Sequence, residues 1–276
     1  MLENKFNLSD KDFFQLREFI EKNFGLKIPD YKKYLLESRL LTRMRALNIF
    51  SYKNYIDYVF NPANKQEIYN MIDVVTTHKT DFFREKDHFD FLQHRYLPKI
   101  NENQHLKIWS AASSTGEEVY SIALTIMEYN RLNNKNIDFT VYGSDVSKGS
   151  LEMAASGIYS MGKIEGIPID LRNKYFLKHK DPKINLTKLK PEITNKTLFF
   201  YLNLNEAIYS IGIEFDIIFC RNVLIYFNKP KQEEILQKVI NYLKNNGLLF
   251  IGHSESLFSM NLPVKLIQSS IYQKIN

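Results

Sequence analysis

A pair of acids stands at the start of a predicted helix, directly after an apolar segment. In the segment WSAASSTGEEVYS, small residues are followed by Glu117 and Glu118. Small side chains allow a ligand to approach the backbone closely. Two acids at this position disfavour a pyrophosphate and suit a cationic ligand, such as a sulfonium or an α-amino group. Acids also stabilise the positive end of a helix dipole, so this segment alone leaves both interpretations open.

A third acid ends the segment VYGSD, which has the apolar character of a buried strand. Asp145 lies at the carboxyl end of this strand. A carboxylate in this place can accept hydrogen bonds from both hydroxyls of a ribose. It can equally cap the helix that SKGSLEMA predicts, and one residue can serve both purposes.

Two further strand ends carry polar side chains. Asn203 and Leu204 follow FFY, where the edge of an adenine could be read, although an Asn turn is the simpler interpretation. Arg221 and Asn222 follow the apolar run FDIIFC, and Tyr226 comes four residues later. A buried charge without a partner is costly, so Arg221 must meet either a ligand or a structural salt bridge.

The elements that position these residues fall into two regions. Residues 1–76 show helical periodicity, with predicted helices over 10–25, 31–49, 51–60 and 65–77. Ser9 or Asp10 and Ser51 are candidate caps for two of them, and Gly25 is a candidate helix end. No strand pattern is found here, which predicts a small all-helical domain.

From residue 106 onward, apolar strand patterns alternate with helical ones. Strands are predicted over 106–112, 139–145, 199–204, 214–222 and 248–256, and helices over 114–132, 147–159 and 230–247, the last ending at Gly247. This alternation indicates right-handed βαβ units and a parallel sheet covered on both faces. Short predicted strands at 175–179, 183–189 and 193–200 interrupt it and indicate a small antiparallel insertion. The segment 263–275 predicts a closing hairpin.

Composition narrows the class of protein. The hydrophobic fraction of 44% supports a folded core, and no apolar run approaches the ~20 residues needed to cross a bilayer. The charged N-terminal segment lacks a signal core, so we expect a cytoplasmic protein. Cys220 is the only cysteine, which excludes an internal disulfide and a cysteine-based metal cluster, and we predict no metal. The net charge of +6 suits an acidic partner, either nucleic acid or a carboxylate-rich protein surface.

With these segments in hand, the chain resembles the CheR-type chemotaxis protein methyltransferases over nearly its whole length. The resemblance rests on long motifs in one order: TTHKTDFFREKDHF, IWSAASSTGEEVYSIAL, GSDVSKGSLEMAASGIY, FDIIFCRNVLIYF and LLFIGHSESL. It implies an all-α N-terminal domain (1–76), a linker over the cofactor site (77–90), and an α/β, Rossmann-like methyltransferase domain (91–276). The small antiparallel β insertion would span about 164–197.

The resemblance also implies an activity. The family transfers a methyl group from S-adenosylmethionine to glutamate side chains of bacterial chemoreceptors, leaving S-adenosylhomocysteine. Carried over to this sequence, the donor would be bound by His78, Thr80, Arg84, Glu117 or Glu118, Asp145, Asn203, Leu204, Arg221 and Asn222. Arg84 and Tyr226 would be catalytic, by orienting the substrate carboxylate. His78 is a departure, because the family commonly has Asn there. The resemblance leaves open whether a ring nitrogen of His78 keeps the cofactor contact.

The expected partners follow from the same resemblance. They are the cytoplasmic helical domains of methyl-accepting chemoreceptors, which are acidic, and Arg39, Arg43 and Arg45 are candidate docking residues. A monomer is expected, with no nucleic acid bound and no insertion into a membrane. Two alternatives stay open: a nucleic-acid methyltransferase, which would use the same cofactor domain, and a non-catalytic module that only binds the cofactor and a partner.

Overall fold

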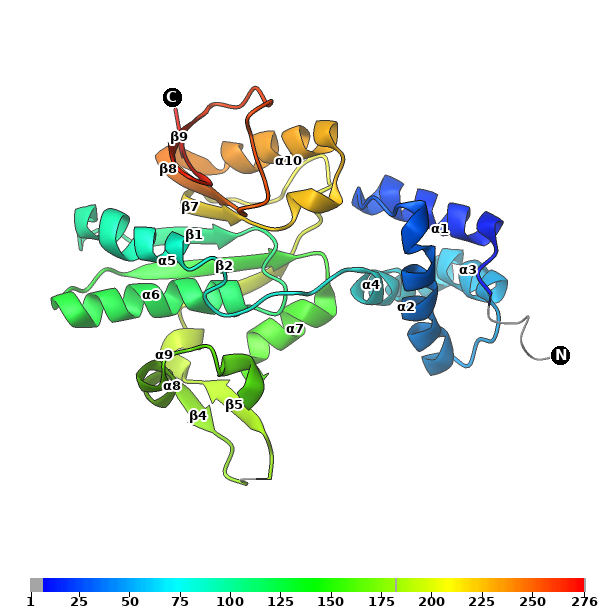
Figure 1. Cartoon of the computed structure of the whole chain (residues 1–276), viewed down its shortest axis with the longest axis horizontal. Helices are drawn as coiled ribbons and strands as arrows, with labels where there is room; N and C mark the ends of the chain where they lie inside the picture. Colours follow the sequence, from blue (N-terminus) through cyan, green and yellow to red (C-terminus); the bar gives the residue numbers. More distant parts are fainter. Residues whose placement is uncertain (1–6, 182, 276) are drawn as a thin grey trace.

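The computed structural model describes residues 7–181 and 183–275. Figure 1 shows a helical domain on one side, an α/β domain on the other, and a small lobe that projects from the α/β domain. Within the described residues, no helix is both long and apolar enough to span a membrane.

The helical domain confirms the prediction of an all-α N-terminal region. It contains α1 (Asp10–Phe24), α2 (Lys33–Ala46), α3 (Tyr52–Phe60) and α4 (Lys65–Val75). Ser9 caps α1 by accepting a hydrogen bond from the Asp12 N–H, and Gly25 ends it with a φ of 70°. Ser51 caps α3 in the same way. The buried faces of these helices form one separate hydrophobic core.

The α/β domain is built on a mixed sheet of seven strands. Their order is β6 (Thr197–Tyr201), β2 (Phe139–Asp145), β1 (Leu106–Ser110), β7 (Phe215–Cys220), β8 (Leu243–Ile251), β10 (Ile271–Lys274) and β9 (Val264–Gln268). The first five are parallel. The last two form the predicted hairpin, in which β10 is antiparallel to both β8 and β9. The chain order reverses between β1 and β7, and such a switch point opens a crevice at the carboxyl ends of the strands.

Helices cover both faces of this sheet. One core joins the sheet to α6 (Glu117–Asn133) and to the helical segment of α5 (Asp87–Phe91), η4 (Leu92–Tyr96) and η5 (Leu97–Lys99). The other core joins it to α10 (Lys229–Asn241). Trp109 is fully buried in this second core and donates a hydrogen bond to the Ser144 hydroxyl.

The small lobe is a second sheet of three antiparallel strands, in the order β3 (Ile158–Ser160), β5 (Leu186–Leu189) and β4 (Phe176–Lys178). It also holds η6 (Met161–Ile164), α8 (Ile169–Tyr175) and α9 (Pro191–Thr194). Two predictions were wrong here. The helix predicted to 159 is α7 (Lys148–Ser156), which ends where Gly157 adopts a φ of 61°. The strand predicted over 193–200 divides into α9 and β6, and β6 pairs with β2 in the main sheet.

The predicted end of the helix at Gly247 was also wrong. The helix α10 ends at Asn241, and Gly247 lies inside β8. Phe215 pairs with Leu243 and Ile217 pairs with Leu248, so β8 bulges between these positions. The bulge accommodates Asn246, whose φ is 62°. Gly247 therefore lies next to a bulge in β8 and does not end a helix. Helical periodicity in the sequence could not show this.

The two domains are joined through the end of α1. The last carbonyl groups of a helix have no partner within the helix. The Asn203 side-chain amide donates to the Asn23 carbonyl at 2.9 Å, and the Asn205 amide donates to the Lys22 carbonyl at 3.0 Å. The Lys27 N–H donates to the Tyr226 carbonyl at 2.9 Å. The α/β domain therefore supplies hydrogen bonds that α1 cannot make for itself.

A second junction joins α4 to α7. The Asp73 carboxylate accepts a hydrogen bond from the Gly149 N–H at 3.1 Å, in the first turn of α7. The Lys148 ammonium lies 3.5 Å from the centre of the Tyr69 ring. Because α7 directly follows Asp145, the helical domain supports the strand end that carries this acid.

Replacing Gly25 with Ala should weaken the docking of α1. The left-handed φ disfavours any residue with a Cβ, and that atom would lie 2.9 Å from both Asn205 Oδ1 and the Phe227 ring. We expect a loss of about 2 kcal/mol in the free energy of unfolding, measured by urea denaturation. Gly212→Ala, where the added Cβ meets nothing within 4 Å, is the control. Equal midpoints for both variants would contradict this account of the junction.

Candidate active site at the carboxyl edge of the sheet

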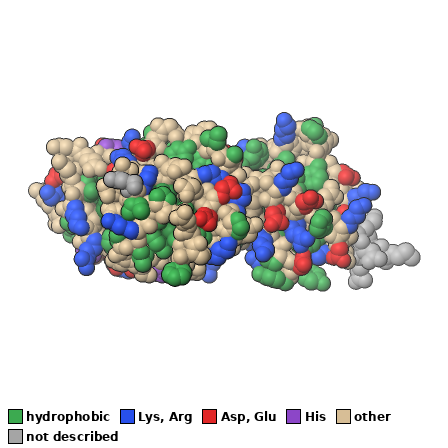
Figure 2. Space-filling view, turned by 90° about the horizontal axis from the view of Figure 1, so that it is seen from above, with side chains coloured by type: hydrophobic (Ala, Val, Ile, Leu, Met, Phe, Trp, Pro, Cys, Tyr) green, Lys and Arg blue, Asp and Glu red, His purple; other side chains and the backbone are tan. Residues whose placement is uncertain are grey.

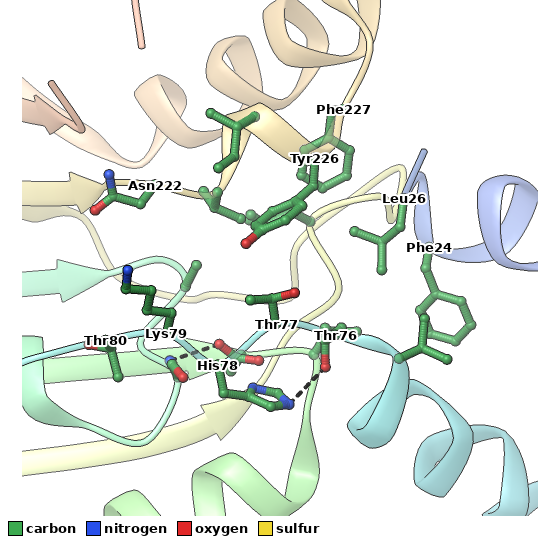
Figure 3. Close-up of a pocket in the computed structure, with 18 of the residues that line it drawn as sticks. Phe24, Leu26, Thr76, Thr77, His78, Lys79, Thr80, Asn222, Tyr226 and Phe227 are labelled. Atoms are coloured by element: carbon green, nitrogen blue, oxygen red, sulfur yellow. Dashed lines mark hydrogen bonds between the residues drawn. The ribbon is translucent and has the colours of Figure 1, made fainter. Parts of the chain in front are cut away.

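A cavity of about 330 Å³ lies where the strand ends, the linker and the helical domain meet. The strand ends and the loops after them contribute Ala111, Ala112, Glu118, Asp145, Leu204 and Asn222, among others. The end of α4 and the linker run along one side with residues 75–81 and Arg84, and the helical domain closes another side with Phe24, Leu26 and Leu36. Figure 3 shows the Lys79 and Tyr226 side chains extending into the space between the linker and the loop after β7.

Most of the predicted site residues meet in this cavity. Its walls include His78, Thr80, Arg84, Glu118, Asp145, Asn203, Leu204, Arg221, Asn222 and Tyr226. Arg39 also lines it, although the sequence analysis placed Arg39 on a docking surface. Glu117, Arg43 and Arg45 do not line it.

Asp145 is fixed by the backbone on either side of it. Its two carboxylate oxygens accept hydrogen bonds from the Ser114 N–H at 2.8 Å and the Ser147 N–H at 2.9 Å. Ser114 adopts a φ of 48°, which turns the loop after β1 toward the acid. Burial raises the pKa of Asp145, and these backbone hydrogen bonds oppose the rise. Each oxygen keeps a lone pair that can accept a further hydrogen bond from a ligand.

The two neighbouring acids of GEE have different surroundings. Glu118 lines the cavity and accepts hydrogen bonds from the Ser110 hydroxyl at 2.7 Å and from Arg221 at 2.8 Å. Glu117 is only 1% exposed and accepts a hydrogen bond from the Thr115 hydroxyl at 2.6 Å. Its other oxygen lies 3.4 Å from the Lys163 ammonium, and burial raises its pKa. The structure therefore brings Glu118 to the cavity and keeps Glu117 out of it.

Arg221 is buried beneath the cavity, with its side chain 1% exposed. Its guanidinium donates to Glu118 and to Glu85, each at 2.8 Å, and to the Arg84 carbonyl at 2.6 Å. The salt bridge that the sequence analysis left open for this arginine is thus present. Because Glu85 and Arg84 belong to the linker, Arg221 holds the linker against the strand ends.

Glu85 is a site residue that the sequence analysis missed. Besides Arg221, it accepts a hydrogen bond from the Asn222 side-chain amide at 3.1 Å. Burial by itself raises the pKa of the Glu85 carboxyl, but the hydrogen bonds from Arg221 and Asn222 outweigh it and bring the pKa to about 2. The sequence offered one indication of this role. Glu85 lies beside Arg84 in FFREKDHF, and an acid at that position can form an ion pair with a buried arginine from another segment.

Glu255 was also missed, and it shapes the turn after β7. Its carboxylate accepts hydrogen bonds from the Asn222 N–H at 2.9 Å and the Leu224 N–H at 2.8 Å. Asn222 has a φ of 56°, a conformation that these contacts hold in place. The turn in this way presents Tyr226 to the cavity.

Asn203 and His78 use their polar atoms within the protein. The Asn203 amide donates to Asn23, and its oxygen accepts from the Asn205 N–H at 3.0 Å. His78 Nε2 lies 2.8 Å from the Asp73 carbonyl and must carry hydrogen there, because a carbonyl can only accept. His78 Nδ1 is then the acceptor for the Ser150 hydroxyl at 2.9 Å. Both residues therefore reach the cavity with their polar groups already bonded.

The cations of the cavity wall are mostly free of acidic partners. Among the residues that the structure describes, no ion pair is formed by the following five lining residues: Lys27, Lys32, Arg39, Lys79 and Arg84. Arg84 donates instead to the Lys79 carbonyl at 2.9 Å, and Arg39 donates to the Val75 and Thr76 carbonyls. Lys79 and Arg84 come from the linker, whereas the acids Glu118 and Asp145 come from the sheet side. The sheet side thus carries the acids Glu118 and Asp145, with Arg221 paired to Glu118. The linker side carries Lys79 and Arg84, together with Asp81, which is paired with Lys163 of the small lobe.

The three predicted docking arginines of α2 have different surroundings. Arg39 faces the linker, and Arg43 forms two hydrogen bonds with the buried Glu67, at 3.0 and 2.7 Å. Of the three, only Arg45 is exposed. Alternation of charge along a sequence could not show which of these side chains would find an internal acceptor.

Comparison with known proteins identifies the family of this chain. Residues 78–273 match the family model described as "CheR methyltransferase, SAM binding domain", and residues 11–76 match "CheR methyltransferase, all-alpha domain". The chain is 34% identical to Chemotaxis protein methyltransferase 2 of Pseudomonas aeruginosa, covering 97% of this chain and 94% of that protein. It is 35% identical to the Chemotaxis protein methyltransferase of Salmonella typhimurium, covering 96% of this chain and 90% of that protein. The Chemotaxis protein methyltransferase of Borreliella burgdorferi is 34% identical, over 99% of this chain and 98% of that protein.

The residues present fit the cofactor of this family. S-adenosylmethionine carries a sulfonium, an amino group and a ribose, and the cavity offers the Glu118 and Asp145 carboxylates beside the small residues Ala111 and Ala112. The Asp145 oxygens accept only backbone N–H groups among the described residues and can take up hydroxyl donors. On the sequence match and this donor set together, the chain belongs to the CheR methyltransferase family and is an S-adenosylmethionine-dependent chemotaxis protein methyltransferase, of the class that methylates chemoreceptor glutamates.

Proposed function

We propose that the acidic wall of the cavity binds the methyl donor and the basic wall binds the substrate carboxylate. The observation that carries this assignment is the separation of charge within one cavity. Glu118 and Asp145 stand on the sheet side, and Lys79 and Arg84 stand on the linker without ion-pair partners among the described residues. A cationic donor and an anionic acceptor are each attracted to the wall of opposite charge.

For the donor, each acid has a distinct role in this proposal. The Asp145 carboxylate accepts hydrogen bonds from the ribose hydroxyls, and Glu118 accepts from the amino group. Leu204 contacts the adenine, together with the backbone of Asn203, because the Asn203 side-chain amide is already bonded to α1. Thr80 and His78 contribute to the wall from the linker. Residues 77–90 act in this scheme as one functional linker that closes the site.

For the acceptor, the chain supplies orientation. A glutamate side chain has an ordinary pKa of about 4.3 and is ionised at neutral pH, so no general base is needed. S-adenosylmethionine supplies a methyl group that is already activated by the sulfonium. The Arg84 guanidinium and the Tyr226 hydroxyl orient the carboxylate, and apolar residues of the helical domain exclude water from the cavity. Arg84 must hold the carboxylate loosely, because the negative charge disappears during transfer.

Arg221 has a different part in the proposal. Its guanidinium is buried, and its two terminal nitrogens donate to Glu85, Glu118 and a backbone carbonyl. We therefore assign it to holding the linker and Glu118 in place. Direct contact with the donor is left to Glu118 itself.

The partner in this proposal is the acidic helical domain of a chemoreceptor in the cytoplasm, bound by a monomer of this chain. Lys27, Lys32 and Lys79 lie along the cavity and suit the carboxylates that flank a target glutamate. On the face shown in Figure 2, basic and acidic side chains are interspersed over both domains. The charge that selects the partner is therefore assigned to the cavity and its rim, in preference to the +6 net charge of the chain.

Asp145→Asn should weaken donor binding. An amide cannot reproduce the charge or both acceptor oxygens, and hydrogen bonds to a charged group contribute about 1.5–3 kcal/mol, so the affinity for S-adenosylhomocysteine should fall about 10- to 100-fold. Calorimetry measures this directly. Asp138→Asn is the matched control, because Asp138 precedes the opposite end of the same strand. Unchanged affinity in the Asp145 variant would remove the ribose role.

Arg84→Met should lower turnover with little effect on donor binding. Loss of one positioned donor to a reacting oxyanion typically lowers the rate on the order of 100-fold. Base-labile methyl groups transferred to receptor-containing membranes provide the assay, and calorimetry with S-adenosylhomocysteine reports on the donor site. Arg95→Met, an exposed arginine of η4, is the control. Near-normal methyl transfer by the Arg84 variant would exclude this residue from orienting the substrate.

Glu85→Gln tests whether the Glu85–Arg221 contact, which holds the linker, makes stability depend on pH. The folded pKa of Glu85 is about 2 against an ordinary value of 4.5, so its ionised form contributes stability above pH 4.5 and loses it as the pH falls toward 2. The gap in unfolding free energy between the parent protein and the variant should be constant above about pH 5 and shrink below pH 4.5. Denaturant titrations at several pH values measure it. Glu152→Gln, an exposed acid on α7, should show no such gap; a pH-independent gap for Glu85→Gln would refute the clamp.

A further inference from the structure

The small lobe holds the linker through a lysine that the activity does not explain. Lys163 in η6 places its ammonium against the Thr80 carbonyl, 3.0 Å from Asp81 Oδ1 and 3.4 Å from Glu117 Oε1. Thr80 and Asp81 are linker residues that line the cavity, and Glu117 begins α6. One side chain of the lobe therefore joins the linker to the helix that carries Glu118.

Aromatic packing reinforces this polar contact. The Phe82 ring of the linker lies edge-on against Tyr159 of β3, with centroids 5.1 Å apart, and against Phe176 of β4, at 5.9 Å. These two rings belong to the two outer strands of the three-stranded sheet. The linker segment from Thr80 to Phe82 is consequently seated on the lobe, immediately before Arg84.

The lobe also contacts the loop that precedes Glu117. The Tyr159 hydroxyl donates to the Thr115 carbonyl at 2.7 Å. A Cβ at Gly116, whose φ is 96°, would lie 2.8 Å from Ala154 and 3.0 Å from the Tyr159 hydroxyl. The lobe thus touches both walls of the cavity, the linker and the loop after β1.

The buried Glu117 carboxylate explains why a lysine lies at this position. Its Oε1 is buried and has no hydrogen-bond partner among the described residues, so the nearby Lys163 supplies the compensating charge. The lysine is 32% exposed and paired with Asp81 as well, which makes it a bridge between a buried acid and a surface acid of the linker. Such a bridge fixes the linker only while the lobe keeps its place.

We propose that Lys163 is a positioning residue through which the small lobe sets the place of Thr80 and Arg84. The position of the lobe is then coupled to the donor site. A change in the lobe, including one caused by a partner bound to it, alters donor affinity and turnover. By reciprocity, donor binding must stabilise the lobe.

Lys163→Met tests the proposal. We expect affinity for S-adenosylhomocysteine, measured by calorimetry, and turnover each to fall on the order of 10-fold, because displacement of a positioning segment propagates to the reacting groups. The melting temperature should also fall, because the buried Glu117 carboxylate loses its compensating charge, so both quantities are measured well below the onset of unfolding. Lys163→Arg should restore both quantities to within about 2-fold, since it keeps the charge and the reach. Lys188→Met, an exposed lysine on β5 of the same lobe, is the matched control and should leave both unchanged.

The double variant Lys163→Met with Glu117→Gln distinguishes two causes of a defect. One is displacement of the linker, and the other is a buried Glu117 carboxylate left without a compensating charge. If the defect of Lys163→Met came only from stranding a buried Glu117 carboxylate, the double variant would recover donor affinity. We expect it to stay defective, because Thr80 and Asp81 are still released. Recovery in the double variant would overturn the proposal.

Hydrogen exchange provides a readout that does not depend on the receptor or on turnover. Saturating S-adenosylhomocysteine should slow amide exchange in Ile158–Ile164 several-fold in the parent protein and in Lys188→Met, but not in Lys163→Met. Equal protection of this segment in the parent protein and in Lys163→Met would overturn the coupling. These measurements use S-adenosylhomocysteine alone. Their outcome therefore does not depend on whether the protein methylates a given receptor.

Discussion

The position of the linker over the strand ends depends on one buried guanidinium. Removing an arginine from water is costly unless acceptors surround it. Arg221 meets this requirement with Glu118 from α6 and with Glu85 and a backbone carbonyl from the linker. These acceptors come from segments far apart in the sequence, so satisfying the charge forces the linker onto the strand ends. The cavity exists because the linker is held there, and the Glu118 carboxylate is aimed by the same contact.

Charge is distributed across the cavity in a way that suits two substrates of opposite sign. The strand ends supply carboxylates, and the linker supplies Lys79 and Arg84. Acids and cations that faced each other directly would neutralise one another as salt bridges. Here Arg84 donates to a backbone carbonyl, and neither Arg84 nor Lys79 forms an ion pair among the described residues, which preserves their charge for an anion. The apolar side chains from the helical domain complete the enclosure, and the resulting low dielectric strengthens each of these attractions.

The site is supported from three sides by contacts to backbone groups. The α/β domain satisfies the open end of α1 through Asn203 and Asn205. Asp73 of the helical domain accepts a hydrogen bond from the first turn of α7, which follows Asp145. The small lobe holds the linker through Lys163. Each contact joins an element of one part to a loop of the site. The helical domain and the lobe are therefore structural parts of the active site as well as candidates for contact with a partner.

The sequence by itself determined the local features. Apolar periodicity and caps defined α1 and α3 with their ends, and the alternation of strands and helices gave the fold class, because both depend on neighbours a few residues away. The convergence of Asp145 and Arg221 also followed, since parallel strands end at one edge of the sheet. Tertiary structure alone decided which polar groups find internal partners. Glu117 pairs with Lys163, Arg43 with Glu67, and His78 with Ser150. Gly247 likewise belongs to a strand because of the register between β7 and β8. These outcomes depend on partners brought close only by folding, and residue type and spacing carry no information about that proximity.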